Sequence, residues 1–152
     1  MRNCGSAGIG APLRFFMVFF LAGTVWAVEP LVLAQQHFQS GLAYERLGRL
    51  AEAYTELQLA VNLDPENAQV SLAVGLVASR LGNMEKAQYF LERSISIDAG
   101  SCASYYQLAL LYEKKDLADR ANESWQRFYG LTQDTALKAV AQKHIQNLEG
   151  RP

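Results

Sequence analysis

The residue types that most often catalyse reactions or bind metals are scarce in this sequence of 152 residues, which contains two histidines and two cysteines. His37 and His144 lie far apart in the chain, and His144 falls on an apolar helical stripe, which is typical of a packed histidine. The sequence contains no HExxH, CxxC or glycine-rich phosphate loop. We therefore expect no catalytic residues, no metal site and no cofactor, and we predict that the protein is not an enzyme.

The overall composition argues against two further classes of protein. Apolar residues make up 50% of the chain, which is enough to bury a core and too many for a disordered protein. The formal net charge of -1 provides no basic excess for binding nucleic acid. Strict alternation of apolar and polar residues, the pattern of half-buried strands, does not stand out anywhere. An all-α protein is therefore predicted.

Residues 1–34 are predicted to be a targeting segment. Arg2 and Arg14 precede an apolar run that begins at Phe15 and ends at Val28, and the first acidic residue is Glu29. A positive start followed by a short apolar run is typical of a secretory signal peptide. The run is short for a helix that crosses a bilayer, which needs about 20 apolar residues.

Two cleavage points fit the preference for small residues, one after Ala27 and one after Ala34. We favour Ala34, because Gln35 then opens the next region directly. An uncleaved signal anchor is the alternative, and in either case the following residues are expected beyond the membrane. Cleavage removes Cys4 and leaves Cys102, to which the sequence assigns no role.

The rest of the chain repeats its small and apolar residues every 34 positions. The matching sets are Gly41, Gly75 and Ala109; Ala53, Ala87 and Ala121; and Leu57, Leu91 and Trp125. A fixed period of this length indicates stacked helix-turn-helix units. We expect them at about residues 34–67, 68–101 and 102–135, with Gly48, Gly82 and Asp116 at the turns between helices.

Residues 133–149 form another amphipathic helical pattern, with Thr132 as its predicted N-cap and Gly150 as its stop. A stack of repeats leaves an apolar face open at its end, and a helix with one polar face closes it. We assign this helix a capping role.

The repeat unit resembles the tetratricopeptide repeat (TPR), whose pattern is W-x2-L-G-x2-Y, then A-x3-F, then P. The residues at those places are His37, Ser40, Gly41, Tyr44, Ala53, Leu57 and Pro65; then Ser71, Val74, Gly75, Ala78, Ala87, Leu91 and Ala99; then Tyr105, Leu108, Ala109, Tyr112, Ala121, Trp125 and Gln133. The opening Trp is absent, and the closing Pro is kept only as Pro65. The resemblance implies an all-α, right-handed solenoid of three repeats plus a capping helix over residues 35–149.

The resemblance also implies that the first helix of each unit lines a concave groove. The residues predicted there to bind a partner are Phe38, Leu42, Glu45, Gln69, Leu72, Leu76, Arg80, Tyr106, Leu110 and Glu113. An apolar floor with a rim of both charges suits an amphipathic helix or an extended apolar peptide. The Lys/Asn clamp of chaperone-binding members is missing, because those places hold Phe38, Leu42 and Ala73. The alternative occupant is the chain's own N-terminal segment, since an open apolar groove is costly to leave wet.

These observations predict a non-enzymatic, exported module that binds a protein or peptide and neither nucleic acid nor a cofactor. The resemblance makes the bacterial periplasm the expected setting and a scaffold or assembly factor the expected role. The alternative is a structural protein that self-assembles end to end, tethered to the membrane by an uncleaved N-terminal segment. The sequence names neither the partner nor the oligomeric state.

Overall fold

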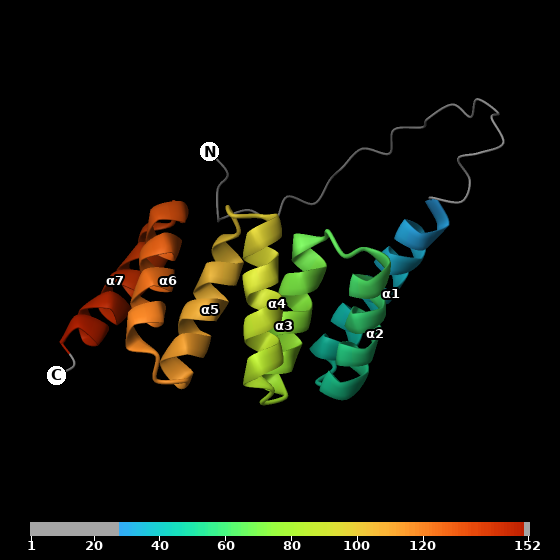
Figure 1. The fold of residues 1–152 in the computed structure, drawn as a ribbon, viewed down its shortest axis with the longest axis horizontal. Coiled ribbons are helices and arrows are strands. Elements are labelled where there is room, and N and C mark those ends of the chain that lie inside the picture. Colours follow the sequence, from blue (N-terminus) through green and yellow to red (C-terminus); the bar gives the residue numbers. More distant parts are fainter. Residues whose placement is uncertain (1–27, 151–152) are drawn as a thin grey trace, which may run out of the picture.

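The computed structural model of the protein describes residues 28–150, and within that range it is entirely helical (Figure 1). Its helices are α1 (Val28–Arg46), α2 (Leu50–Leu63), α3 (Ala68–Arg80), α4 (Met84–Ile97), α5 (Cys102–Lys114), α6 (Ala118–Leu131) and α7 (Thr135–Glu149). The predicted all-α class is confirmed. Among these described helices, none is long and apolar enough to cross a bilayer.

The helices form a single row of hairpins, from α1 at one end to α7 at the other (Figure 1). Helix α1 packs on α2, α3 on α4, and α5 on α6, while α7 packs on α6. The second helix of each hairpin also contacts the first helix of the next one, and the first helices contact each other along the row. This is the helical solenoid that the repeat predicted.

The turn inside each hairpin has the same backbone structure in all three cases. Gly48, Gly82 and Asp116 have positive φ angles of 74°, 82° and 57°, respectively, as a helix end closed by a left-handed residue requires. The N–H of the next residue then returns to a carbonyl five positions earlier, at 2.9 Å: Arg49 to Tyr44, Asn83 to Ala78 and Leu117 to Tyr112. The 34-residue period is thus a true structural period.

The two helices of each hairpin approach closely because small residues lie where they meet. A Cβ added to Gly41 would lie 2.6 Å from Cγ of Leu57, and one added to Gly75 would lie 2.9 Å from Cγ of Leu91. Such distances are shorter than van der Waals contact allows, so each leucine occupies the space that a side chain would take. In the third hairpin Ala109 and Trp125 hold these places, and both are fully buried.

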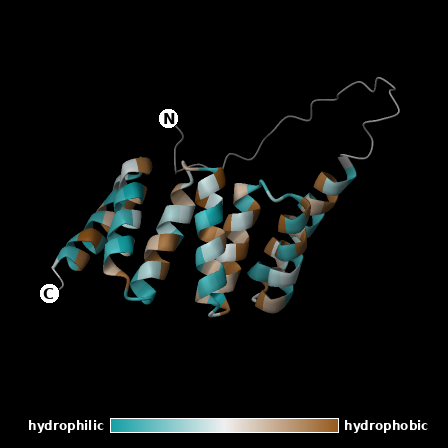
Figure 2. Ribbon diagram, in the orientation of Figure 1, coloured by the Kyte–Doolittle hydropathy of each residue, from teal (hydrophilic) through white to brown (hydrophobic). Residues whose placement is uncertain are grey.

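Helix α1 is longer than its counterparts. Helices α3 and α5 begin at Ala68 and Cys102, which makes Ala34 the equivalent start, yet α1 begins six residues earlier, at Val28. Ala34 is buried, whereas Leu31, Val32 and Leu33 are 54%, 51% and 43% exposed. Figure 2 shows hydrophobic residues, in brown, near this end of α1. The rest of the predicted targeting segment, residues 1–27, lies outside the described residues.

Helix α7 begins at Thr135, two residues later than its pattern indicated, and Asp134 rather than Thr132 is its N-cap. The Asp134 carboxylate accepts hydrogen bonds from the N–H groups of Ala136 and Leu137, at 2.8 and 3.3 Å. Thr132 is fully buried, and its hydroxyl accepts from the Asp134 N–H instead. The predicted cap was therefore wrong by two residues, because the chain turns at Thr132 before the helix starts.

Replacing Leu91 with alanine should lower the free energy of unfolding by about 2–5 kcal/mol, because it leaves a cavity where α4 meets α3. Leu91 is 1% exposed. Urea unfolding followed by circular dichroism measures this change. Leu47→Ala is the matched control, since Leu47 is 71% exposed and its replacement should change stability by less than about 0.5 kcal/mol. Equal effects of the two substitutions would contradict the packing described here.

Candidate functional site

A cleft of about 400 Å³ runs along the first helices of the three hairpins. Its floor is apolar and is made by Phe38 and Leu42 of α1 and by Leu72 and Leu76 of α3. All four side chains are partly buried. Phe38 and Leu72 also pack against the hydrophobic core. The remaining lining residues are Glu45, Gln69, Ala73, Ala103 and Gln107.

Six of the ten residues predicted to contact a partner line this one cleft: Phe38, Leu42, Glu45, Gln69, Leu72 and Leu76. Two alanines of the lining were not among the ten. Ala73 lies one turn after Gln69 on α3, and Ala103 lies 34 residues after Gln69 on α5. The period itself marks Ala103, but a methyl side chain carries no chemical signal that would have singled it out.

The charged rim of the cleft is internally paired. Arg80 of α3 donates to the Glu45 carboxylate of α1 in a close ion pair, which joins two neighbouring first helices. The side chains of Arg80 and Glu45 are 46% and 22% exposed. Arg80 therefore neutralises the one carboxylate that lines the cleft, so the surface of the cleft is mainly apolar.

Tyr106 and Leu110 of α5, which were predicted to continue the groove, do not line this cleft. The Tyr106 ring packs edge-on against Trp125, with 5.4 Å between ring centroids. It also packs at a tilt against Phe128, with 5.2 Å between centroids. Leu110 also packs against the core of the third hairpin. A second, smaller hollow of about 220 Å³ lies here, and Tyr106, Phe128 and Leu137 contribute to it. Because it shares Ala103 and Gln107 with the cleft, the two hollows adjoin at the start of α5.

Glu113, the last of the ten predicted residues, joins the three final helices. Its Oε1 accepts from Trp125 Nε1 of α6 at 2.7 Å and lies 2.7 Å from His144 Nδ1 of α7. The His144 ring also stacks on Trp125, with centroids 4.3 Å apart. The structure thus places Glu113 in a packing cluster with Trp125 and His144 and not in the cleft. Nothing in the α5 sequence could reveal this, because both partners come from other helices.

The other histidine also has a carboxylate partner: His37 Nδ1 of α1 lies 2.8 Å from Glu56 Oε2 of α2. Among residues 28–150, no three or more histidine, cysteine, aspartate or glutamate side chains gather closely enough to hold a metal ion.

The comparison with protein families identifies two of the units. The family model described as "Tetratricopeptide repeat" matches residues 35–67 and 68–100. The TPR resemblance is therefore confirmed for the first two units, in the register that the 34-residue period set. No curated protein sequence is similar enough to this chain to match it.

Solved TPR structures share the fold at low sequence identity. The first TPR of Spaghetti (RPAP3), bound to an HSP90 peptide, has a TM-score of 0.72 at 16% identity, over 79% of this chain and 96% of that one. PcrH in complex with the chaperone-binding region of PopD has a TM-score of 0.72 at 20% identity, over 77% of this chain and 91% of that one. Yersinia enterocolitica SycD in complex with a YopD peptide has a TM-score of 0.71 at 13% identity, over 76% of this chain and 91% of that one. These likenesses establish a TPR-type solenoid.

Replacing Glu113 with alanine should lower the free energy of unfolding by about 1–3 kcal/mol, because it leaves the buried Trp125 N–H without its acceptor. Urea unfolding followed by tryptophan fluorescence measures the change close to the site. Glu66→Ala is the control, because Glu66 is exposed and a surface change of this kind is worth less than about 0.5 kcal/mol. If the two variants unfold alike, Glu113 does not hold the last three helices together.

Proposed function

We propose that the protein is a non-enzymatic interaction module that holds a peptide or an amphipathic helix of a protein partner in the cleft along α1, α3 and α5. The observation that carries this proposal is the apolar floor of Phe38, Leu42, Leu72 and Leu76, which the chain's own described helices leave uncovered. Support comes from the fold neighbours, three of which are described in complex with a peptide or a chaperone-binding region.

The lining specifies the chemistry of the ligand. Four large apolar side chains favour a segment with apolar residues on one face, because burying them against the floor removes apolar surface from water. Gln69 and Gln107 add amide donors and acceptors that suit the polar backbone of an extended segment. Phe38, Leu42 and Ala73, which stand at the places of the Lys/Asn clamp, all line the cleft. The cleft would therefore bind the apolar side chains of the ligand and not its terminal carboxylate.

The third hairpin is proposed to be a third TPR repeat, with α7 as the cap of the solenoid. Support comes from the 34-residue spacing and from the turn at Asp116, whose backbone matches those at Gly48 and Gly82. Helix α7 packs on α6, and only Ala141 and Leu148 of its side chains are buried. A helix with one narrow buried face suits the end of a stack.

The module is also proposed to act after export, in the bacterial periplasm, with residues 1–34 as the leader. The sequence pattern of Arg2, Arg14 and the following apolar run supports this. The start of α1 adds support, because exposed Leu31, Val32 and Leu33 lie before Ala34, the point at which the repeat period begins. Cleavage after Ala34 would leave a first helix of nearly the same length as α3 and α5.

Mass spectrometry of the protein purified from a bacterial periplasm should find Gln35 as the first residue, because the leader is cut after Ala34 during export. A first residue of Val28 would move the cut to Ala27. An intact chain in the membrane fraction would favour the anchored alternative. An intact chain in the cytosol would contradict export.

Replacing Leu76 with glutamate should abolish retention of the partner, because it places a charge on the apolar floor of the cleft. The measurement is cross-linking in periplasmic extract followed by mass spectrometry, with circular dichroism to verify that the variant stays helical. Leu59→Glu is the matched control: Leu59 lies on α2 outside the cleft, is 41% exposed and should leave the cross-linked partner unchanged. A partner that cross-links equally to both variants would remove the cleft as its binding site.

A further inference from the structure

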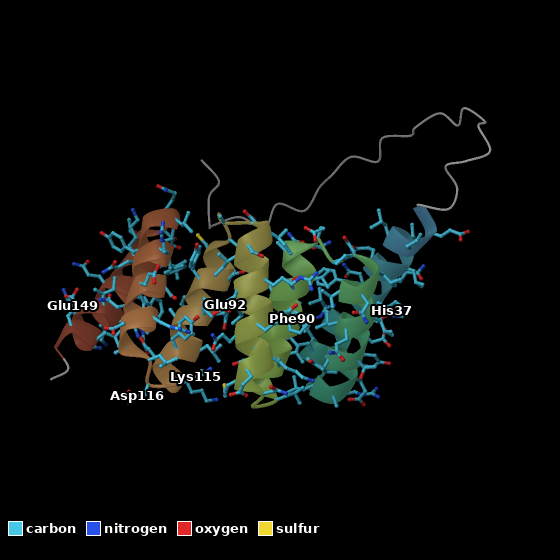
Figure 3. The ribbon with its side chains drawn as sticks, in the orientation of Figure 1. His37, Phe90, Glu92, Lys115, Asp116 and Glu149 are labelled. Atoms are coloured by element: carbon cyan, nitrogen blue, oxygen red, sulfur yellow. The ribbon has the colours of Figure 1, made fainter. Side chains whose placement is uncertain are left out.

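The smaller hollow lies between α5 and α7, with α6 beneath it. In Figure 3 the labelled Glu149 marks α7 at the end of the row of helices. Phe128 of α6 is buried and forms the floor, whereas Tyr106 and Leu137 are half-buried and Ala103 is exposed. The hollow is therefore open to solvent along α5 and α7. Its lining, which contains no charged residue, is Cys102, Ala103, Tyr106, Gln107, Phe128 and Leu137.

Trp125 of α6 separates α5 from α7 at this end of the stack. Helices α1 and α3 contact each other, as do α3 and α5, but no Cα atom of α5 lies within 8 Å of one in α7. The Trp125 ring contacts both helices, edge-on to Tyr106 at 5.4 Å and stacked on His144 at 4.3 Å. In the first two hairpins a smaller leucine, Leu57 or Leu91, holds the place of Trp125. The larger ring accounts for the wider spacing of α5 and α7, and this spacing leaves the hollow.

The hollow continues the line of the cleft. The cleft is lined by residues 38–45 in α1, 69–76 in α3 and 103–107 in α5, so it approaches the starts of the first helices along the row. The hollow follows with residues 102–107 at the start of α5 and with Leu137 near the start of α7. A segment lying along the cleft from α1 to α5 would therefore point into the hollow.

A short side chain joins the two spaces. Ala103 and Gln107 line both of them. Ala103 stands at the place that Gln35 and Gln69 hold in the first two units. Alanine removes the long amide side chain from this place, so an apolar group can pass from the cleft to the hollow without burying an unpaired amide.

We propose, on the basis of the function proposed for the cleft, that the hollow is its anchor pocket and takes one large apolar side chain from the same bound segment. The uncharged lining favours an uncharged side chain, because a charge placed there would lose its water without gaining a partner. The volume of about 220 Å³ is larger than the about 150 Å³ of an apolar cavity that binds benzene. A phenyl ring or a leucine side chain therefore fits. Leu137 makes α7 a wall of the binding site as well as the end of the stack.

An extended segment of seven residues is long enough to reach from α1 to the hollow. The axes of helices in contact lie about 8–10 Å apart, so α1 and α5 are about 16–20 Å apart across the row. Seven extended residues span about 23 Å, and alternate side chains point to the same face. The probe is therefore the blocked peptide Ac-Phe-Ser-Leu-Ser-Leu-Ser-Phe-NH2. Its phenylalanines at both ends allow it to bind in either direction.

The full-length, isotope-labelled protein is titrated with this peptide and with Ac-Ala-Ser-Leu-Ser-Leu-Ser-Ala-NH2, which lacks the anchors, and two-dimensional NMR reports affinity and position. The phenylalanine peptide should bind about tenfold more tightly, because its ring loses apolar surface to the hollow. It alone should shift the amides of Tyr106 and Leu137. Equal affinities, or no shifts at the hollow, would overturn the anchor pocket. If Leu76→Glu still abolishes binding of both peptides in that case, the proposed function of the cleft stands.

Ala103→Gln restores the amide side chain of the first two units where the cleft meets the hollow. It should reduce the tenfold preference for the phenylalanine peptide to about one, because the passage is then filled. Ala51→Gln is the matched control: Ala51 is exposed on α2, outside both the cleft and the hollow, and its replacement should keep the preference. An unchanged preference in Ala103→Gln, with circular dichroism showing that the variant is folded, would overturn the proposal.

Leu137→Ala tests the part that α7 plays in binding. Removing this wall should lower the preference for the phenylalanine peptide to about threefold, because the ring loses apolar contact. Val140→Ala is the control on the same helix, since Val140 is 38% exposed and does not line the hollow. The ratio of two affinities measured on one folded variant does not change through a loss of stability. An unchanged ratio in Leu137→Ala would exclude α7 from the binding site.

Two other occupants of the hollow would be revealed by the same titrations. Peptide binding that appears only after cleavage behind Ala34 would make residues 1–34 the occupant. A dimer in sedimentation that Ala103→Gln converts to a monomer would make a second copy of the chain the occupant. Either result would overturn the proposal, and binding of neither peptide to either form of the chain would count against the cleft as well.

Discussion

The structure depends on how closely the two helices of each hairpin approach. Where Gly41 and Gly75 lack a Cβ, Leu57 and Leu91 fill the space, so the helices mesh in the same way in both hairpins. The left-handed residue at each turn fixes the direction of the second helix. Since the three turns share one backbone structure, stacking the hairpins brings the first helices into contact along one side. The cleft along the first helices, the groove of the repeat stack, is a consequence of this repetition and does not need a dedicated structural element.

The third hairpin departs from the first two at the residue that meets the small position. Trp125 replaces the leucine, and its larger ring contacts Tyr106, Phe128 and His144. Its indole N–H also binds Glu113, which lies close to His144 of α7. Residues that would have lengthened the groove are therefore used to join the last three helices. Because these side chains pack the end of the stack, the apolar cleft is shorter than predicted.

The groove illustrates how repeated units build a common surface. The groove depends on what the repeats share, since Leu42 and Leu76 hold the same place in successive units and both line it. The third repeat differs from the second elsewhere, since Tyr105, Tyr112 and Ser124 stand at the places of Ser71, Ala78 and Phe90. A solenoid tolerates such differences because each repeat contacts only its neighbours.

The sequence alone determined the helical class, the 34-residue period, the turns at Gly48 and Gly82 and six residues of the groove, because all of these follow from local spacing along one chain. Only the tertiary structure decided that Glu113 binds Trp125 and approaches His144, that Arg80 neutralises Glu45, and that α1 begins at Val28. Each side-chain pairing joins different helices, so its geometry depends on how the helices are docked.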